Sequence, residues 1–263
     1  MLKYLRLILT AGWRILWDFL FYINRYARHP ERYPLELRYK RVRDLIVFIE
    51  KSYRIDVQTQ GLEGIRGLER EKRAFLVVAD HLSYFDPLGM TALCERPISF
   101  VAKKETIKMP FIGTAVKAID GVFLDREDLR QSLEAMKTVE KRLASGYCSY
   151  VIFPEGTRNR HPENGVAAFH PGSFKPAVVA GTPIVVCGLY GTTRVFPKKP
   201  DYKRTPVEYY FYPPIEGKGL RTTEFAPKAY EMVVAKFEEG KAEDKRFFEK
   251  GFDKVPLRKG KVR

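Results

Sequence analysis

His81 and Asp86 could form an acid–base pair, because they lie five residues apart in a polar segment, residues 80–87. An apolar run precedes this segment and Pro87 ends it, which favours a loop between a strand and a helix that Asp86 caps. In such a loop the carboxylate can bind one imidazole nitrogen, leaving the other free to deprotonate a hydroxyl group. The spacing also fits a plain helix cap beside a loop histidine, so the pair alone does not decide between these interpretations.

Two later segments could bind an anionic group. Residues 121–126 end in Arg126, and residues 150–158 end in Glu155-Gly156-Thr157-Arg158. A glycine allows close approach of the backbone, and arginine forms bidentate hydrogen bonds with phosphate oxygens. Together with Lys103 and Lys104, the two arginines predict a cationic cradle for a phosphate group.

The elements that must position these side chains alternate along the chain. Predicted strands cover residues 75–79, 98–101, 121–124, 147–153, 183–189 and 207–212. Predicted helices cover residues 87–94, 106–118, 128–145, 173–180 and 225–239. This alternation predicts an α/β fold with a mixed, largely parallel sheet flanked by helices. Ligands of such sheets collect where the strands end, so Arg126 and His81 should lie at the same edge.

The formal charge of +15 is concentrated towards the ends of the chain. Residues 1–54 contribute +7 and residues 241–263 contribute +5, so residues 55–240 hold only +3. Basic ends on a near-neutral centre favour contact with an anionic surface over binding of nucleic acid. We therefore expect three parts: an N-terminal association motif at 1–54, a catalytic domain at 55–240 and a basic tail at 241–263.

Residues 2–23 are apolar but carry interrupting charges, so they are not expected to span a bilayer or to act as a secretory signal. On a helix, the charged side chains fall within one narrow sector; they are Lys3, Arg14, Asp18 and Arg25. The remainder is apolar, which is typical of a helix that lies in a membrane interface. After Pro30 and Pro34, residues 35–53 predict a second helix with a basic face, formed by Arg38, Lys40, Arg41 and Arg43. Both helices could instead simply pack on the core.

The order and spacing of these motifs resemble the glycerolipid acyltransferases, most closely the bacterial 1-acyl-glycerol-3-phosphate acyltransferases. The resemblance covers about residues 60–215 and is carried by His81-X4-Asp86, by residues 121–126 and by residues 153–158. The segments 102–105 and 109–113 are similar too. The resemblance implies the acyltransferase fold behind a two-helix membrane anchor, on the cytoplasmic face of the cell membrane.

The resemblance also implies a role for each matched residue. His81 would be the general base on the acceptor hydroxyl, and Asp86 would orient it. The phosphate of a lysophospholipid acceptor would be bound by Lys103, Arg126 and Arg158. Glu155 and Gly156 would shape the glycerol end of the site. The acyl donor would be acyl-CoA or acyl carrier protein, with no metal, no further cofactor and no acyl-enzyme.

Three residues depart from the pattern of the family. Asp80 replaces the usual asparagine, His170 a frequent lysine, and Val186 a proline. These changes leave open the electrostatics beside His81, the anion site and the shape of the acyl pocket.

Other functions are weaker fits to the sequence. Ser83 lacks the Gly-x-Ser-x-Gly turn of a hydrolase nucleophile. The four histidines show no metal-ligand spacing, and the three cysteines no CxxC pair, which favours a reducing compartment such as the cytoplasm. Acylation of another acceptor, such as glycerol 3-phosphate or a different lysolipid, and a catalytically silent lipid-binding module both remain open.

Overall fold

Seven strands form one mixed sheet in the computed structural model, which describes residues 11–161, 165–196 and 205–249. The strands are β1 (Ile55–Gln60), β2 (Leu76–Ala79), β3 (Ile98–Lys103), β4 (Val122–Leu124), β5 (Ser149–Ile152), β6 (Ile184–Tyr190) and β7 (Thr205–Phe211). Their order is β1-β7-β6-β2-β5-β3-β4, and every neighbouring pair is parallel except β6 and β7. The expected mixed, largely parallel sheet is therefore confirmed.

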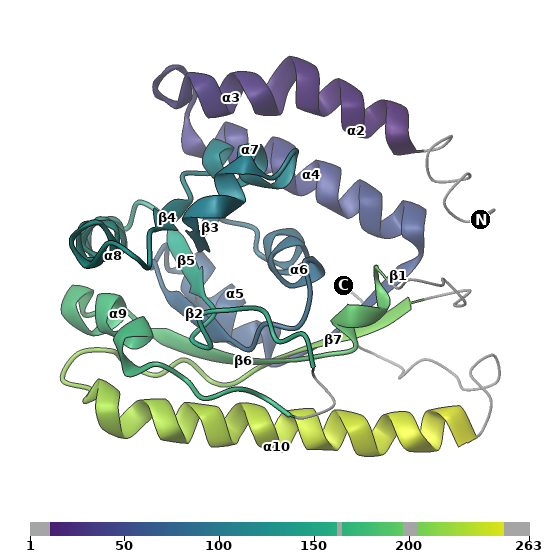
Figure 1. Cartoon of the computed structure of the whole chain (residues 1–263), viewed down its shortest axis with the longest axis vertical. Coiled ribbons are helices and arrows are strands. Elements are labelled where there is room, and N and C mark those ends of the chain that lie inside the picture. Colours follow the sequence, from purple (N-terminus) through teal and green to yellow (C-terminus); the bar gives the residue numbers. More distant parts are fainter. Residues whose placement is uncertain (1–10, 162–164, 197–204, 250–263) are drawn as a thin grey trace.

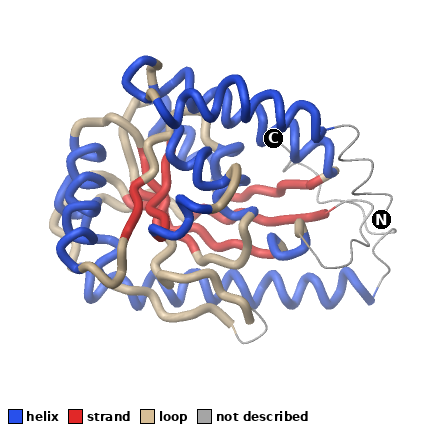
Figure 2. The backbone as a smooth tube through the Cα atoms, turned by 45° about the horizontal axis from the view of Figure 1, so that its top comes forward, coloured by secondary structure: helices blue, strands red, loops and turns tan. Residues whose placement is uncertain are grey.

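Helices cover both faces of this sheet (Figures 1 and 2). In order they are α2 (Trp13–Asp18), the π-helix η2 (Phe19–Ile23), α3 (Asn24–Arg28), η3 (Pro30–Arg32), α4 (Leu35–Tyr53), α5 (Leu62–Arg70), α6 (Phe85–Leu93), η4 (Lys104–Lys108), α7 (Ile112–Ala118), α8 (Leu129–Ala144), η6 (Pro171–Phe174), α9 (Lys175–Ala180), η7 (Thr192–Arg194) and α10 (Thr222–Glu249). Helices α4, α6 and α7 lie on one side, and α9 and α10 on the other (Figure 1).

The central strands β2, β5 and β6 are buried along almost their whole length, as expected for parallel strands covered on both faces. Their side chains form the core together with those of the covering helices. The predicted helix at residues 106–118 is instead two pieces, η4 and α7, with Pro110 between them. Proline lacks the N–H that a continuous helix would need at that position.

Helix α4 packs into the core and does not present a uniformly basic face. Tyr39, Val42 and Ile46 are buried in the main apolar cluster. Arg38 is also buried, with its guanidinium 2.9 and 2.8 Å from the two carboxylate oxygens of Asp120. Arg38 therefore does not share an exposed face with Lys40, contrary to the expected pattern, because its charge is neutralised inside the fold.

The helix formed by α2, η2 and α3 lies outside α4 (Figure 1). It buries a charged side chain and exposes several apolar ones. Asp18 is buried, and its carboxylate pairs with Arg14 at 3.3 Å and with Arg41 of α4 at 3.4 Å. Five large apolar side chains of the same helix are at least half exposed: Trp13, Leu16, Trp17, Leu20 and Phe21. Lys3 lies outside the described residues.

Among the described residues, none of the helices combines the length and the apolar character that crossing a membrane requires. At the other end of the chain, α10 continues past residue 240, so the expected tail begins within a helix. Residues 250–263 of that tail lie outside the described residues.

Candidate active site

His81 and Asp86 form the hydrogen-bonded pair that their spacing predicts. Nδ1 of His81 lies 2.7 Å from Oδ2 of Asp86, which also accepts the backbone N–H groups of Leu82 and Ser83 at 2.7 Å each. Asp86 is fully buried in the first turn of α6 and does not cap that helix, which begins at Phe85. A carboxylate is an acceptor only, so Nδ1 carries the proton and Nε2 is left as the basic nitrogen.

The loop that carries His81 is fixed from the other side by Glu155. Its Oε1 accepts the backbone N–H of His81 at 2.6 Å, and its Oε2 accepts that of Ala167 at 3.1 Å. Burial raises the pKa of the Glu155 carboxyl, although these two donors and nearby His81 act in the opposite direction. The backbone N–H of Asn159 also donates to the carbonyl of His81 at 2.7 Å. Glu155 thus shapes the site by holding the backbone, since both its oxygens are used there.

An aromatic ring supports the imidazole itself. The ring of Phe153 lies 4.1 Å from that of His81, with an angle of 18° between the planes. The stacking and the bond to Asp86 together set the orientation of the imidazole. The side chain of His81 remains 19% exposed, so a substrate can reach it.

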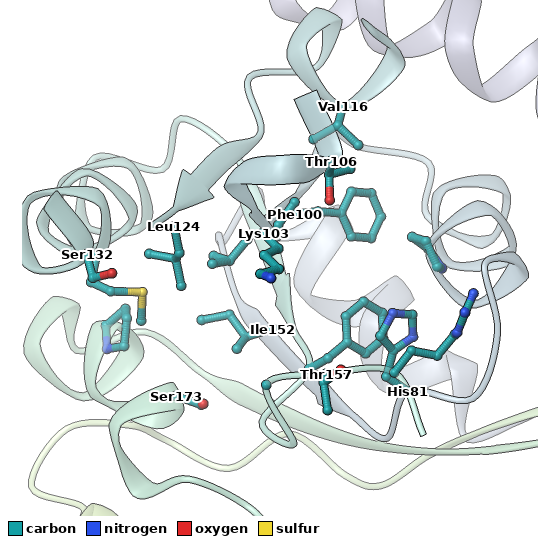
Figure 3. A pocket seen from close by; sticks show the side chains of 18 of the residues that line it. His81, Phe100, Lys103, Thr106, Val116, Leu124, Ser132, Ile152, Thr157 and Ser173 are labelled. Carbon is teal, nitrogen blue, oxygen red and sulfur yellow. The ribbon is translucent and has the colours of Figure 1, made fainter. Parts of the chain in front are cut away.

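His81 lies in the wall of a cavity of about 800 Å³. Figure 3 shows His81 towards one end and Ser132 towards the other, with Lys103 and Ile152 between them in this view. Much of the lining is apolar and comes from several helices and strands; it includes Val42, Ile46, Leu88, Phe100, Val116, Ile119, Leu124, Met136, Ile152 and Val179. A cavity of this size and lining suits a long aliphatic chain with its reacting end at His81.

Cationic side chains border the same cavity. Lys103, Arg126 and Arg158 all contribute to its lining, together with Gly156. Gly156 has φ +73°, and a Cβ atom there would lie 3.6 Å from a guanidinium nitrogen of Arg126. In the part of the chain that the structure describes, neither arginine forms an ion pair with an acidic side chain. Lys103 has one, with Glu105 at 3.3 Å, and both of those side chains are exposed.

Lys104 does not join this group, contrary to the expected cradle. Its ammonium group lies 2.7 Å from Oδ2 of Asp125, and it is not part of the cavity lining. The hydrogen bond between the two raises the pKa of Lys104 and lowers that of Asp125. Strand β3 ends at Lys103 and η4 begins at Lys104, so the two side chains leave the edge of the sheet from different elements, and only Lys103 lines the cavity.

The three residues that depart from the family pattern lie in different surroundings. His170 lines the cavity, and its ring carbon would be 3.6 Å from a Cβ atom at Gly156. Val186 is buried within β6 beside Val78 and does not line the cavity. Asp80 is fully buried directly before His81, and its Oδ1 accepts the N–H of Leu189 at 2.8 Å.

One contact at the site was not predicted from the sequence. The guanidinium of Arg158 lies over the ring of Tyr84, 3.9 Å from its centre. Both side chains line the cavity. An aromatic residue in the loop after His81 is the only signal that the sequence offers for this contact, and it does not specify the partner.

The described residues contain no group of three or more His, Cys, Asp or Glu side chains placed to hold a metal ion. The site's titratable groups are instead a histidine–carboxylate pair and several cations. This set can deprotonate a hydroxyl group while binding an anion next to it.

Comparisons with known proteins agree with this chemistry. A family model described as "Acyltransferase" matches residues 56–190. A probable 1-acyl-sn-glycerol-3-phosphate acyltransferase of Mycoplasma pneumoniae is 30% identical over 190 residues, which cover 70% of this chain and 68% of that protein. The corresponding protein of Mycoplasma genitalium is 34% identical over 174 residues, and the match spans 64% of this chain and 62% of that protein.

A solved structure is also similar over most of the chain. The crystal structure of the 1-acyl-sn-glycerophosphate (LPA) acyltransferase PlsC from Thermotoga maritima covers 88% of this chain and 88% of its own, with a TM-score of 0.62 and 27% sequence identity. The similarity therefore extends beyond the segment that the family model matches.

Proposed function

Because this chain belongs to the acyltransferase family, we propose that it transfers a fatty acyl group from a thioester to the free hydroxyl of 1-acyl-glycerol 3-phosphate, giving phosphatidic acid. The observation that carries this proposal is the His81–Asp86 pair in the wall of a largely apolar cavity bordered by cations. The similar proteins of both Mycoplasma species and of Thermotoga maritima are named for the same acceptor, which supports this proposal.

His81 is the general base of the reaction. Nε2 of His81 takes the proton of the acceptor hydroxyl while the hydroxyl oxygen attacks the carbonyl carbon of the thioester. Asp86 keeps the proton on Nδ1 and stabilises the imidazolium that forms. The C–S bond then breaks, and the leaving thiolate takes the proton back from Nε2. The products are the new ester and a free thiol, with no covalent enzyme intermediate and no metal.

Arg126, Arg158 and Lys103 bind the acceptor phosphate. Phosphate is recognised best by guanidinium groups that are not already paired with an acid. Within the described ranges, neither Arg126 nor Arg158 forms such an ion pair. Glu155 and Gly156 shape the adjacent turn, since Glu155 holds the backbone of His81 and Gly156 adopts a left-handed conformation with φ +73°. The apolar lining holds aliphatic chain.

The enzyme works at the surface of a membrane, on its cytoplasmic face, as a peripheral or monotopic protein. The exposed apolar side chains of α2 and η2 support this assignment, because large apolar patches on a protein surface mark interaction sites. The net charge of +15 favours an anionic surface. The donor is acyl-CoA or an acyl carrier protein thioester, and both are acidic molecules that this charge would attract.

The test is thiol release from palmitoyl-CoA and, separately, from an acyl carrier protein thioester, with and without 1-acylglycerol 3-phosphate. Release should require the acceptor and should fall about 10²- to 10⁴-fold in His81→Ala, the range for loss of a general base. His29→Ala is the matched control, because that histidine is exposed on the outer helical segment. Release without acceptor would indicate a thioesterase instead. No release with either donor from folded, vesicle-bound protein would favour another acceptor or a silent lipid-binding protein.

A further inference from the structure

Three buried carboxyl groups surround the backbone of His81. Asp80 and Asp86 are fully buried, and Glu155 is 6% exposed. Repulsion in a site of low dielectric makes it costly for all three to be ionised together. At least one of them should therefore hold a proton.

The hydrogen bonds distinguish the three groups. Oδ2 of Asp86 lies against three donors, and each oxygen of Glu155 accepts one backbone N–H. Among the described residues, Asp80 accepts one hydrogen bond from a neighbouring strand, the N–H of Leu189 in β6, through Oδ1. Its Oδ2 is buried without a hydrogen-bond partner among the described residues. Oδ1 of Asp86 is buried in the same way, but the other oxygen of Asp86 has three donors. Hydrogen bonds to an anion favour ionisation, so Asp80 is the least stabilised of the three as a carboxylate.

Among the residues that the structure describes, no cation compensates the charge that Asp80 would carry. Within the described part of the chain, no lysine or arginine forms an ion pair with it. The titratable groups near it are Asp86 from α6, Glu155 after β5, and Cys187 of β6. Burial raises the pKa of the Cys187 thiol, which keeps that thiol neutral. Burial, with the nearby Asp86 and Glu155, likewise raises the pKa of Asp80 well above its ordinary value of 3.8, against the hydrogen bond from Leu189.

We propose that Asp80 is a positioning residue that works as a neutral carboxylic acid. Its carbonyl oxygen fastens the end of β2 to β6 through Leu189, directly before His81. Its protonated oxygen adds no third negative charge beside the imidazole. The inference rests on the proposed role of His81 as a base.

The first test compares the pH dependence of kcat/KM in the wild type, Asp80→Asn and Asp80→Ala. An amide has the shape of a protonated carboxyl group, so Asp80→Asn should keep activity within about threefold near neutral pH, whereas Asp80→Ala, which leaves the N–H of Leu189 unpaired, should lose about tenfold or more. At alkaline pH the wild type should lose activity as Asp80 ionises, and Asp80→Asn should not. A loss of about 100-fold in Asp80→Asn near neutral pH would show that the charged carboxylate is needed, and would overturn the proposal.

The second test measures stability and needs no activity. The folded chain keeps a proton on Asp80 that the unfolded chain releases above its ordinary pKa of 3.8. The folding equilibrium constant of the wild type, relative to that of Asp80→Asn, should therefore fall by about tenfold per pH unit between that value and the pKa in the folded state. Asp44→Asn, at an exposed position on α4, is the control and should show no such slope.

If the ratio of the folding equilibrium constants of the wild type and Asp80→Asn does not change with pH, the proposal is contradicted, whether or not the protein transfers acyl groups. If the folding equilibrium constant falls with pH as predicted but no acyl transfer is found, Asp80 is a neutral carboxyl group and the proposed function is wrong. The two failures are therefore distinguishable.

Discussion

The guanidinium carbon of Arg158 lies over the ring of Tyr84, 3.9 Å from the ring centre. Tyr84 belongs to the loop between His81 and Asp86, whereas Arg158 follows β5, so the contact joins the base and the anion site. Stacking leaves the N–H groups at the edge of a guanidinium free for a phosphate.

Replacing Tyr84 with leucine should therefore weaken acceptor binding. We expect KM for 1-acylglycerol 3-phosphate to rise about three- to tenfold, with kcat changed less, since a cation–π contact of this kind contributes roughly 0.5–1 kcal/mol or more. Tyr84→Phe is the matched control, because it keeps the aromatic face. Equal KM values for the leucine and phenylalanine variants would show that the stacking does not position Arg158.

Substitutions on the outer helix should test membrane contact without disturbing the cavity. Trp13→Ser combined with Trp17→Ser should weaken binding to anionic vesicles by at least about tenfold, because both rings are exposed and each can bury a large apolar area in the interface. Leu129→Ser is the control, since Leu129 is 75% exposed on α8. Sedimentation with vesicles measures the effect. If the double variant and Leu129→Ser bind equally well, the surface of α2 and η2 does not contact lipid.

The buried pair of Arg38 and Asp120 should contribute strongly to stability. Arg38→Ala leaves the carboxylate of Asp120, which is 13% exposed, without its guanidinium partner. The variant should lower the free energy of unfolding by about 3 kcal/mol, measured with urea. Lys40→Ala, which breaks an exposed pair with Asp44, should cost no more than about 0.5 kcal/mol. Similar losses in both variants would contradict a special role for the buried pair.

The same pair predicts a direction for the pH dependence. Burial acts to raise the pKa of Asp120, but the hydrogen bonds from Arg38 and Tyr147 outweigh it, and the pKa is lowered from its ordinary value of 3.8. A lowered carboxyl pKa stabilises the fold above the ordinary value, and this stabilisation is lost as pH falls through the lowered one. The stability difference between the wild type and Arg38→Ala should therefore shrink below about pH 4.

The sequence predicted the parts of the fold whose signals are local. Strands β2, β5 and β6 are continuous apolar runs, and they are found close to the predicted bounds. Strand β1 was not predicted, because it lies at the edge of the sheet and only Val57 in it is buried. Helix α5 was also missed, since two glycines, Gly64 and Gly67, interrupt its pattern.

In the candidate site too, some contacts could be predicted from local sequence signals and others depend on the tertiary structure. The contact of His81 with Asp86 is one of two arrangements that their spacing allows, and the other motifs favoured it. The approach of Arg126 follows from the parallel strand order. The stacking of Phe153 on His81 depends on how two loops meet, so no local pattern specifies it. Lys103 lines the cavity, whereas Lys104 pairs with Asp125. Two adjacent lysines in the sequence do not reveal which of them faces the cavity.

Helix α4 joins the N-terminal region to the catalytic fold, so the chain cannot be divided between them without loss. Val42 and Ile46 form part of the cavity wall, and Arg38 of the same helix neutralises Asp120. A cut at residue 54 would open the cavity and remove the guanidinium partner of Asp120. The N-terminal helices and the catalytic fold are therefore not interchangeable modules, and chimeras that graft residues 1–54 of another protein onto this one should fail unless they also carry a matching α6 and α7.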